Sequence, residues 1–421
     1  CIFAAAIKWQ FNNLTTGMGA PKRKIINDPV YGFITINHPL IFSILAHPYY
    51  QRLRRITQMA MGQLVYPGAV HTRFHHSLGA YHLMGNAVNE LRSKGTEITE
   101  EEEIAVKAAI LLHDIGHGPY SHALEHVVVK GVHHETLSLQ IMHEMNAAFD
   151  GQLTLAIQIF TGAYHKPFLH QLISGQLDVD RMDYLSRDSF FCGVSEGVIG
   201  YDRILKMLVV VDGQLMIEEK GIYSVEKFLV ARRQMYWQVY LHKTVLSAEK
   251  MLVKILERAR SLYTSNDAAM QTGSALDYFL GTFNGTMDAH ALAQFCALDD
   301  HDIMHAIKRW STHPDKVLSL LCSRFLSRQL YKTTIQSEPF LPATIAAKQK
   351  QSLDAFELDP SEVDYVCFTG EATNTLYQTK DERINILFKD GSIKDISLID
   401  NALIHQNLSA AIKKNYICQL L

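Results

Sequence analysis

The sequence predicts a mainly α-helical protein with short β-hairpins and a small α+β region at its C-terminal end. Apolar residues recur at helical spacing from residue 38 to about 190, and again over residues 265–330. Short apolar runs on either side of turn residues predict the hairpins. We therefore expect an N-terminal extension over residues 1–23, a helical domain over 24–335 and the α+β region over 336–421.

The first elements are justified by local patterns. Residues 30–37 alternate like a short strand. The segment Glu101–Leu112 reads as a helix that delivers residue 113 at its end. Its expected inner face consists of Ile104, Ala108, Leu111 and Leu112. Residues 121–125 look like the start of a further helix.

The second half contains two hairpins and several helices. Residues 208–217 surround Asp212-Gly213, a dipeptide typical of two-residue hairpin turns. Ser224 is expected to cap one long helix that runs to about Arg260.

Beyond residue 336 the predictions are coarser. Residues 337–358 are weakly patterned and suggest a connection, and an apolar run follows over 363–368. A second hairpin is expected over 384–393, and a last helix over 399–417.

Composition limits the class of function. The chain has 421 residues, 48% of them hydrophobic and 20% charged, with a net charge of −3, so nucleic acid is an unlikely partner. No apolar run has membrane-spanning length, and residues 1–10 lack the basic leader of a signal peptide. The six cysteines are scattered, which favours a reducing compartment, the cytoplasm.

The most informative motif is His113-Asp114, at the end of the apolar helix and just before two glycines. An imidazole nitrogen and a carboxylate oxygen suit a divalent metal ion of intermediate hardness. His76 before the pair and Asp180 after it complete a candidate set of four ligands. Such a set predicts one divalent ion (Mn, Fe, Mg, Co, Ni or Zn) that activates water and polarises a phosphoryl oxygen.

These residues match the H…HD…D signature, so the chain resembles the HD-domain phosphohydrolases. Longer stretches are similar to their dNTP triphosphohydrolase branch, the bacterial dGTPases and the vertebrate SAM-and-HD-domain dNTPase. The matching stretches are residues 26–29, 51–54, 66–69, 73–79, 113–122, 134–135 and 178–188. The resemblance implies an HD-type helical core, a homo-dimer or tetramer, and attack of metal-activated water at the α-phosphorus of a dNTP. The products would be a deoxynucleoside and triphosphate.

A triphosphate carries about four negative charges, which a net-acidic protein must neutralise locally. Arg73 lies one helical turn before His76, and Arg181 follows Asp180 directly. A stripe at spacings of four, four and three on the expected long helix consists of Arg232, Tyr236, Tyr240 and Lys243. Taken alone, this stripe could also be a solvated charged face; the resemblance places it in the dNTP pocket.

The resemblance assigns further roles. Gln58 and Tyr184 match positions that read the sugar 3′-hydroxyl and exclude a 2′-hydroxyl, and Asp188 matches another sugar contact. Tyr236 stands where the vertebrate member has a histidine.

Around the metal pair, His117, His122 and His134 match residues that support catalysis, and one histidine is expected to protonate the leaving oxygen. Glu125 stands where the vertebrate member has aspartate. The alternative is that these residues only orient the metal ligands.

Lys24, Asn27, Gln51 and Arg54 match residues that bind an activating nucleotide between subunits. Ala46 replaces the acidic residue that reads guanine there, so a guanine-specific activator site is not expected, and a less selective nucleotide site or none is left open. The alternative is that these four are surface and cap residues.

Two other functions fit the motifs. One is an HD phosphohydrolase that acts on a nucleoside monophosphate or a guanosine alarmone. The other is a non-catalytic nucleotide-binding regulator whose metal ion is structural.

Overall fold

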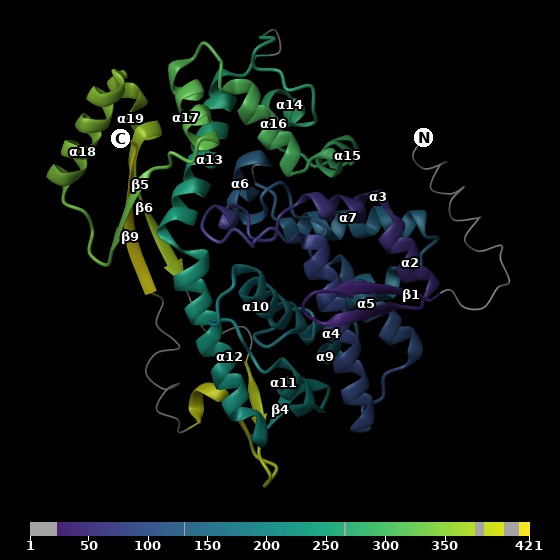
Figure 1. Ribbon diagram of the computed structural model, residues 1–421. Helices are drawn as coiled ribbons and strands as arrows, with labels where there is room; N and C mark the ends of the chain where they lie inside the picture. Colours follow the sequence, from purple (N-terminus) through teal and green to yellow (C-terminus); the bar gives the residue numbers. More distant parts are fainter. Residues whose placement is uncertain (1–22, 130, 265–266, 375–382, 400–411) are drawn as a thin grey trace.

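The computed structural model describes residues 23–129, 131–264, 267–374, 383–399 and 412–421 (Figure 1). These residues form mostly helices, together with three small sheets. The mainly α-helical class with short hairpins is therefore confirmed. Of the expected N-terminal extension, only Arg23 lies within the described residues. In the described part of the chain, no helix combines the length and the apolar character needed to cross a bilayer.

Three helices at the centre position the site: α4 (Arg73–Ser93), α5 (Glu100–Leu112) and α10 (Val179–Cys192). Helix α5 begins with a capping box, in which the Thr99 hydroxyl accepts from Glu102 N (3.1 Å) and the Glu102 carboxylate accepts from Thr99 N (2.8 Å). Its expected inner face is fully buried at Ala108, Leu111 and Leu112. The helix therefore ends directly before residue 113, as the sequence predicts.

Further helices complete the body: α2 (Pro39–Ala46), α3 (Pro48–Gln51), α6 (Glu125–Val128), α7 (His134–Ala148), α8 (Thr154–Phe160), α9 (Pro167–Gln171), α11 (Tyr201–Met207), α14 (Leu276–Gly281), α15 (Ala289–Ala297), α16 (Asp300–Trp310) and α17 (Lys316–Leu326). Single turns of 3-10 helix are η1 (Arg52–Arg55), η2 (Gly62–Leu64), η3 (Ser121–Ala123), η4 (Glu219–Gly221), η6 (Pro360–Glu362) and η7 (Ile396–Leu398). Helices α14 to α17 lie together at the top of Figure 1. The helices expected over residues 265–330 and the helix start at 121–125 are confirmed.

The predicted strands and hairpins form as expected. The strand within residues 30–37 is β2 (Gly32–Ile36), which pairs antiparallel with β1 (Lys24–Asp28). Asp212 and Gly213 join β3 (Leu208–Val211) to β4 (Gln214–Glu218), and both have positive φ (50° and 74°), as a type I′ turn requires.

The second hairpin is β7 (Asn385–Leu387) and β8 (Ile393–Asp395). Strand β7 runs parallel to β4, which makes one four-stranded sheet in the order β3-β4-β7-β8. Two segments far apart in the sequence thus share a sheet.

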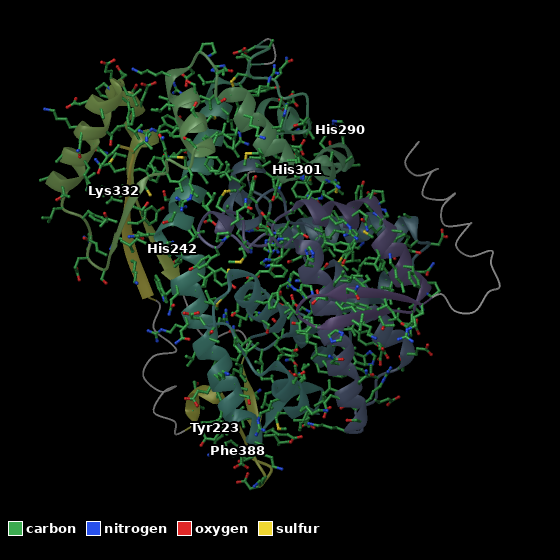
Figure 2. All side chains as sticks on the ribbon, in the orientation of Figure 1. Tyr223, His242, His290, His301, Lys332 and Phe388 are labelled. Atoms are coloured by element: carbon green, nitrogen blue, oxygen red, sulfur yellow. The ribbon has the colours of Figure 1, made fainter. Side chains whose placement is uncertain are left out.

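The long helix predicted from Ser224 to Arg260 is wrong as a single element. The chain forms α12 (Ile222–Met235), a π-helical turn η5 (Tyr236–Tyr240) and α13 (Lys243–Leu262), and the N-cap of α12 is Gly221. In η5 the backbone N of Leu241 donates to Tyr236 O at 2.9 Å, a wide turn. His242, labelled in Figure 2, restarts the helix because its Nδ1 accepts from Thr244 N at 3.2 Å.

Two predictions for the C-terminal part are also wrong. Residues 337–358 contain helix α18 (Pro342–Phe356), whose only buried residue is Ser352, so no apolar stripe revealed it. The helix expected over 399–417 lies partly outside the described residues, and its last part is strand β9 (Ile412–Gln419).

Strand β9 lies between β5 (Lys332–Gln336) and β6 (Cys367–Asn374), which follows the short helix α19 (Val363–Val366). This sheet lies beside α13 on the left of Figure 1. The apolar residues Tyr416, Ile417 and Cys418 are buried in succession, which is typical of a strand paired on both sides.

Candidate active site

Three helix ends meet at the centre of the molecule. Helix α4 begins after the Thr72 N-cap and carries His76 in its first turn, fully buried. Helix α5 ends at Leu112, directly before His113-Asp114. Helix α10 begins after Asp178, whose carboxylate accepts from Arg181 N at 2.7 Å. Asp180 is the second residue of α10, so the N-terminus of α10 faces the start of α4 and the end of α5.

The four candidate metal ligands converge. His76 Nε2 lies 3.0 Å from Asp180 Oδ1 and 3.5 Å from Asp114 Oδ2. His113 Nε2 lies 3.4 Å from the Oδ1 atoms of both Asp180 and Asp114. Ligand atoms that share one ion at about 2.0–2.2 Å lie roughly 3 Å apart, so this spacing suits a single divalent ion.

The hydrogen bonds at the far side of each ring support the same conclusion. His113 Nδ1 donates to the carbonyl of Ile110 at 2.6 Å, and His76 Nδ1 donates to Asp183 Oδ2 at 2.7 Å. Each Nε2 is then left with a lone pair, and both Nε2 atoms are buried without a hydrogen-bond partner. Such an orphaned pair of acceptors beside two carboxylates fits a metal ion.

Electrostatics favour positive charge at this point. Burial lowers the pKa of His76, but Asp180 and Asp183 outweigh burial and raise it to about 10. Burial raises the pKa of Asp180, but His113 and His76 together hold it well below its usual range. A cation between these carboxylates would take the place of the proton.

Arg73 lies against the ligand set. Its Nη1 donates to Asp114 Oδ2 and its Nε donates to Ser121 Oγ at 2.7 Å, and the side chain is buried. Burial raises the pKa of Asp114, but Arg73, His113 and His117 together outweigh burial and hold it well below its usual value, so the carboxylate stays ionised.

A cluster of histidines lies next to Asp114. The His117 and His134 rings stack at 4.0 Å, and the His122 ring stands on edge 4.7 Å from that of His117. Glu125 accepts from the Nδ1 of His134 (2.6 Å) and of His122 (3.1 Å). Burial and Arg73 lower the pKa of His117 well below its usual value, so its ring is neutral. Glu125 therefore orients the two other histidines.

A cavity of about 530 Å³ opens at the ligand set, a size typical of small-molecule sites. The candidate site residues that line it are Gln58, Arg73, Asp114, His117, His122, His134, Asp180, Tyr184, Asp188, Tyr236 and Tyr240. Tyr240 donates to Asp188 Oδ2 at 2.8 Å, and His71 Nε2 donates to Asp188 Oδ1 at 2.7 Å. The Gln58 Oε1 atom is buried and has no partner.

Three expected phosphate contacts do not line this cavity. Arg181 pairs with the Asp178 carboxylate, and Arg232 Nη1 donates to Gln176 Oε1 at 3.1 Å. Lys243 is exposed at the start of α13. The π-helical turn also separates Lys243 from Arg232, so the four residues do not lie on one uninterrupted α-helix. Their contact with substrate stays a prediction.

The candidate activator residues lie at the surface on two separate parts of the chain. Lys24 and Asn27 are exposed on β1. Gln51 ends α3, and its Oε1 accepts from Arg54 Nε at 2.8 Å. The Arg54 guanidinium lies 3.6 Å from the centre of the Phe74 ring.

Two residues of the site, Asp183 and Glu249, were not predicted from the sequence. Asp183 lies one turn after Asp180 on α10, and this helical spacing was the available signal. Glu249 lines the cavity from α13, and burial raises its pKa to about 7. Nothing in the local sequence pointed to Glu249, because its position follows from how α13 packs.

Comparisons with known proteins place the chain among HD-domain proteins. The HD domain family matches residues 73–188, and the HD associated region matches residues 199–280. The chain is 32% identical over 394 residues to the protein YwfO of Bacillus subtilis, covering 89% of this chain and 87% of that one. The crystal structure of a phosphohydrolase from Bacteroides thetaiotaomicron is 48% identical and superposes with a TM-score of 0.88, covering 94% of this chain and all of the other.

The chain is also similar to the human protein named deoxynucleoside triphosphate triphosphohydrolase SAMHD1. The identity is 27% over 452 residues, covering 94% of this chain and 68% of the human protein. The SAMHD1 homologue of Dictyostelium discoideum is 31% identical over 278 residues, or 61% of this chain and 54% of that protein.

Proposed function

We propose, from the premise that this chain belongs to the HD-domain phosphohydrolase family, that it hydrolyses deoxynucleoside triphosphates to deoxynucleoside and triphosphate. One observation carries the proposal. The carboxylates of Asp114 and Asp180 lie in the wall of a nucleotide-sized cavity that also presents Gln58, Tyr184 and Tyr236. The likeness to proteins named dNTP triphosphohydrolases supports the choice of substrate.

His76, His113, Asp114 and Asp180 would hold one divalent metal ion, because their ligand atoms converge and two of them lack any other partner. When bound, such an ion supplies Lewis acidity and lowers the pKa of a water molecule to near neutrality. Arg73, which donates to the Asp114 carboxylate, would also neutralise an oxygen of the α-phosphate.

The histidine cluster would supply the proton for the leaving group. The attacking water gives up one proton to solvent as its oxygen bonds to the α-phosphorus, the bond from phosphorus to the 5′-oxygen breaks, and that oxygen takes a proton from the histidine cluster. His122 lines the cavity, and its Nδ1 donates to Glu125 Oε2 at 3.1 Å, which holds the ring where a proton donor to the leaving oxygen is needed. His117 is kept neutral and suits an orienting role.

The sugar and base would lie along the tyrosines. Tyr240 is fixed by its hydrogen bond to Asp188, and Tyr184 lies edge-on to it with ring centres 6.4 Å apart. An aromatic wall of this kind leaves little room for a 2′-hydroxyl. The unpartnered Gln58 Oε1 can accept from the 3′-hydroxyl.

We also propose that the protein acts in the cytoplasm as a homo-dimer or tetramer, with an activating nucleotide at Lys24, Asn27, Gln51 and Arg54. The surface position of these four residues is compatible with a site between subunits. Size-exclusion chromatography with light scattering, with and without dNTPs, would test the assembly.

The decisive experiment is a panel of the four dNTPs and four NTPs with Mn²⁺, Mg²⁺, Co²⁺ or Fe²⁺, with chromatography of the products. We expect inorganic triphosphate and deoxynucleoside from dNTPs, and no turnover of NTPs. Release of phosphate or pyrophosphate, or turnover of nucleoside monophosphates alone, would contradict the proposed reaction. His113→Ala serves as the inactive control.

A further inference from the structure

A buried chain of charges connects the N-terminal hairpin to the candidate metal ligand His76. It starts at Asp183, which fixes the His76 ring through Nδ1 at 2.7 Å. Arg187 grips Asp183 with two hydrogen bonds, Nε to Oδ2 at 3.0 Å and Nη2 to Oδ1 at 3.1 Å. The other edge of Arg187 grips Asp28, with Nη1 to Oδ2 at 2.8 Å and Nη2 to Oδ1 at 3.3 Å.

The three charged side chains that connect the hairpin to His76 are buried away from water. The side chains of Arg187 and Asp183 are 0% exposed and that of Asp28 is 3% exposed. A Cβ atom at Gly79 of α4 would lie 2.0 Å from Asp183 Oδ1 and 2.2 Å from Arg187 Nη2, so α4 approaches these groups as closely as a glycine permits. In such surroundings, loss of one partner leaves a buried charge uncompensated.

Asp28, the charged residue farthest from His76 in this series, is fixed to the turn between β1 and β2. Asp28 Oδ1 accepts from the backbone N atoms of Val30 and Tyr31, both at 2.9 Å. The Tyr31 ring lies 5.4 Å from the Arg187 guanidinium carbon and covers it. A change in this turn would therefore change the partners of Arg187.

We propose that Asp28 is a positioning residue for the metal centre, acting through Arg187 and Asp183 on the His76 ring. The hairpin β1–β2 is thereby coupled to metal affinity. The inference rests on the metal site in the proposed function, and it is independent of which phosphate ester is hydrolysed. Ligand orientation by outer partners generally contributes about 10- to 100-fold in metal affinity. Because Asp28 acts through two intermediates, we expect about tenfold.

Asp28→Asn tests the coupling, because it removes the charge but keeps an oxygen for the backbone N atoms of the turn. The full chain is stripped of metal with a chelator. Binding is then measured by calorimetry with Mn²⁺ and by the visible absorption of bound Co²⁺. We expect about tenfold weaker Mn²⁺ binding and a changed Co²⁺ spectrum. Asp315→Asn is the matched control, since Asp315 pairs with Arg258 away from the cavity.

Wild-type Mn²⁺ affinity and an unchanged Co²⁺ spectrum in Asp28→Asn would overturn the coupling. An equal loss in Asp315→Asn would also overturn it, because the effect would then be general destabilisation. If Asp28→Asn does not fold, Arg187→Lys decides by the same readouts, since lysine keeps the charge but cannot bridge two carboxylates in the same way. If the wild-type protein binds metal but does not hydrolyse dNTPs, the proposed reaction is refuted, and the coupling between Asp28 and the metal site is not.

Discussion

Arg73 donates a hydrogen bond to the carboxylate of Asp114, from the first turn of α4 to the second residue after α5. The same carboxylate lies 3.5 Å from His76 Nε2, so one aspartate faces both the arginine and the candidate metal position. The Arg73 guanidinium therefore lies beside the candidate metal position, where a phosphate oxygen could contact both the arginine and a bound ion.

Arg73→Lys should lower kcat/KM for dNTP hydrolysis by about 10- to 100-fold, with metal content unchanged. Lysine keeps the positive charge, but it lacks the planar guanidinium group that can donate to Asp114, Ser121 and a phosphate at the same time. Steady-state kinetics and metal analysis of the purified variant would measure both. Arg258→Lys, which alters a pair outside the cavity, should behave as wild type; unchanged kinetics in Arg73→Lys would refute the role.

Removal of metal should abolish hydrolysis, and so should His113→Ala and Asp180→Ala, because each variant lacks one of the four convergent ligands. Elemental analysis should find less than one ion per chain in both variants. His313→Ala changes another histidine, outside the ligand set, and should retain the ion. Full activity of metal-depleted His113→Ala would contradict the assignment.

His122→Ala should lower kcat by about 100- to 10,000-fold, since the 5′-oxygen would leave without a proton donor. A dNTP analogue with sulfur in place of the 5′-oxygen needs little protonation, so the variant should hydrolyse it nearly as fast as wild type does. His143→Ala, at an exposed position of α7, is the control. Equal losses on both substrates would argue for an orienting role instead.

Glu249 should make stability depend on pH. Burial raises its pKa from 4.5 to about 7 in the folded protein. The unfolded chain loses this proton first, so the free energy of unfolding should fall as pH rises from about 4.5 to about 7 and then level off. Glu249→Gln should remove that fall and stabilise the protein at pH 8 by up to about 3 kcal/mol. Urea unfolding at pH 5 and pH 8 measures the difference, and the exposed Glu144→Gln should not change it.

Local chemistry explains which parts of the molecule were predictable. The Asp212-Gly213 turn and the end of α5 before His113 depend on neighbouring residues, and both form as predicted. His76 and Asp180 could be named because they occur in recognisable motifs, although only the fold brings their side chains within 3.0 Å.

Other features depend on contacts between distant segments. Strand β9 has its conformation because β5 and β6 pair with it on both sides, and neither neighbour is visible from its own sequence. Asp28 could not be linked to Arg187 before the hairpin was placed against α10. The π-helical turn replaced an uninterrupted helix because His242 offers a competing cap.

That wide turn has a consequence for how this protein can diverge. Each residue of an ordinary α-helix advances the chain by about 100°, so deletion of one residue within Tyr236–Tyr240 would rotate everything that follows by about that angle. Val245 and Glu249 would then leave the cavity wall together, although neither had been mutated. A single insertion or deletion in this segment would therefore change the residues that line the cavity more than a single substitution would.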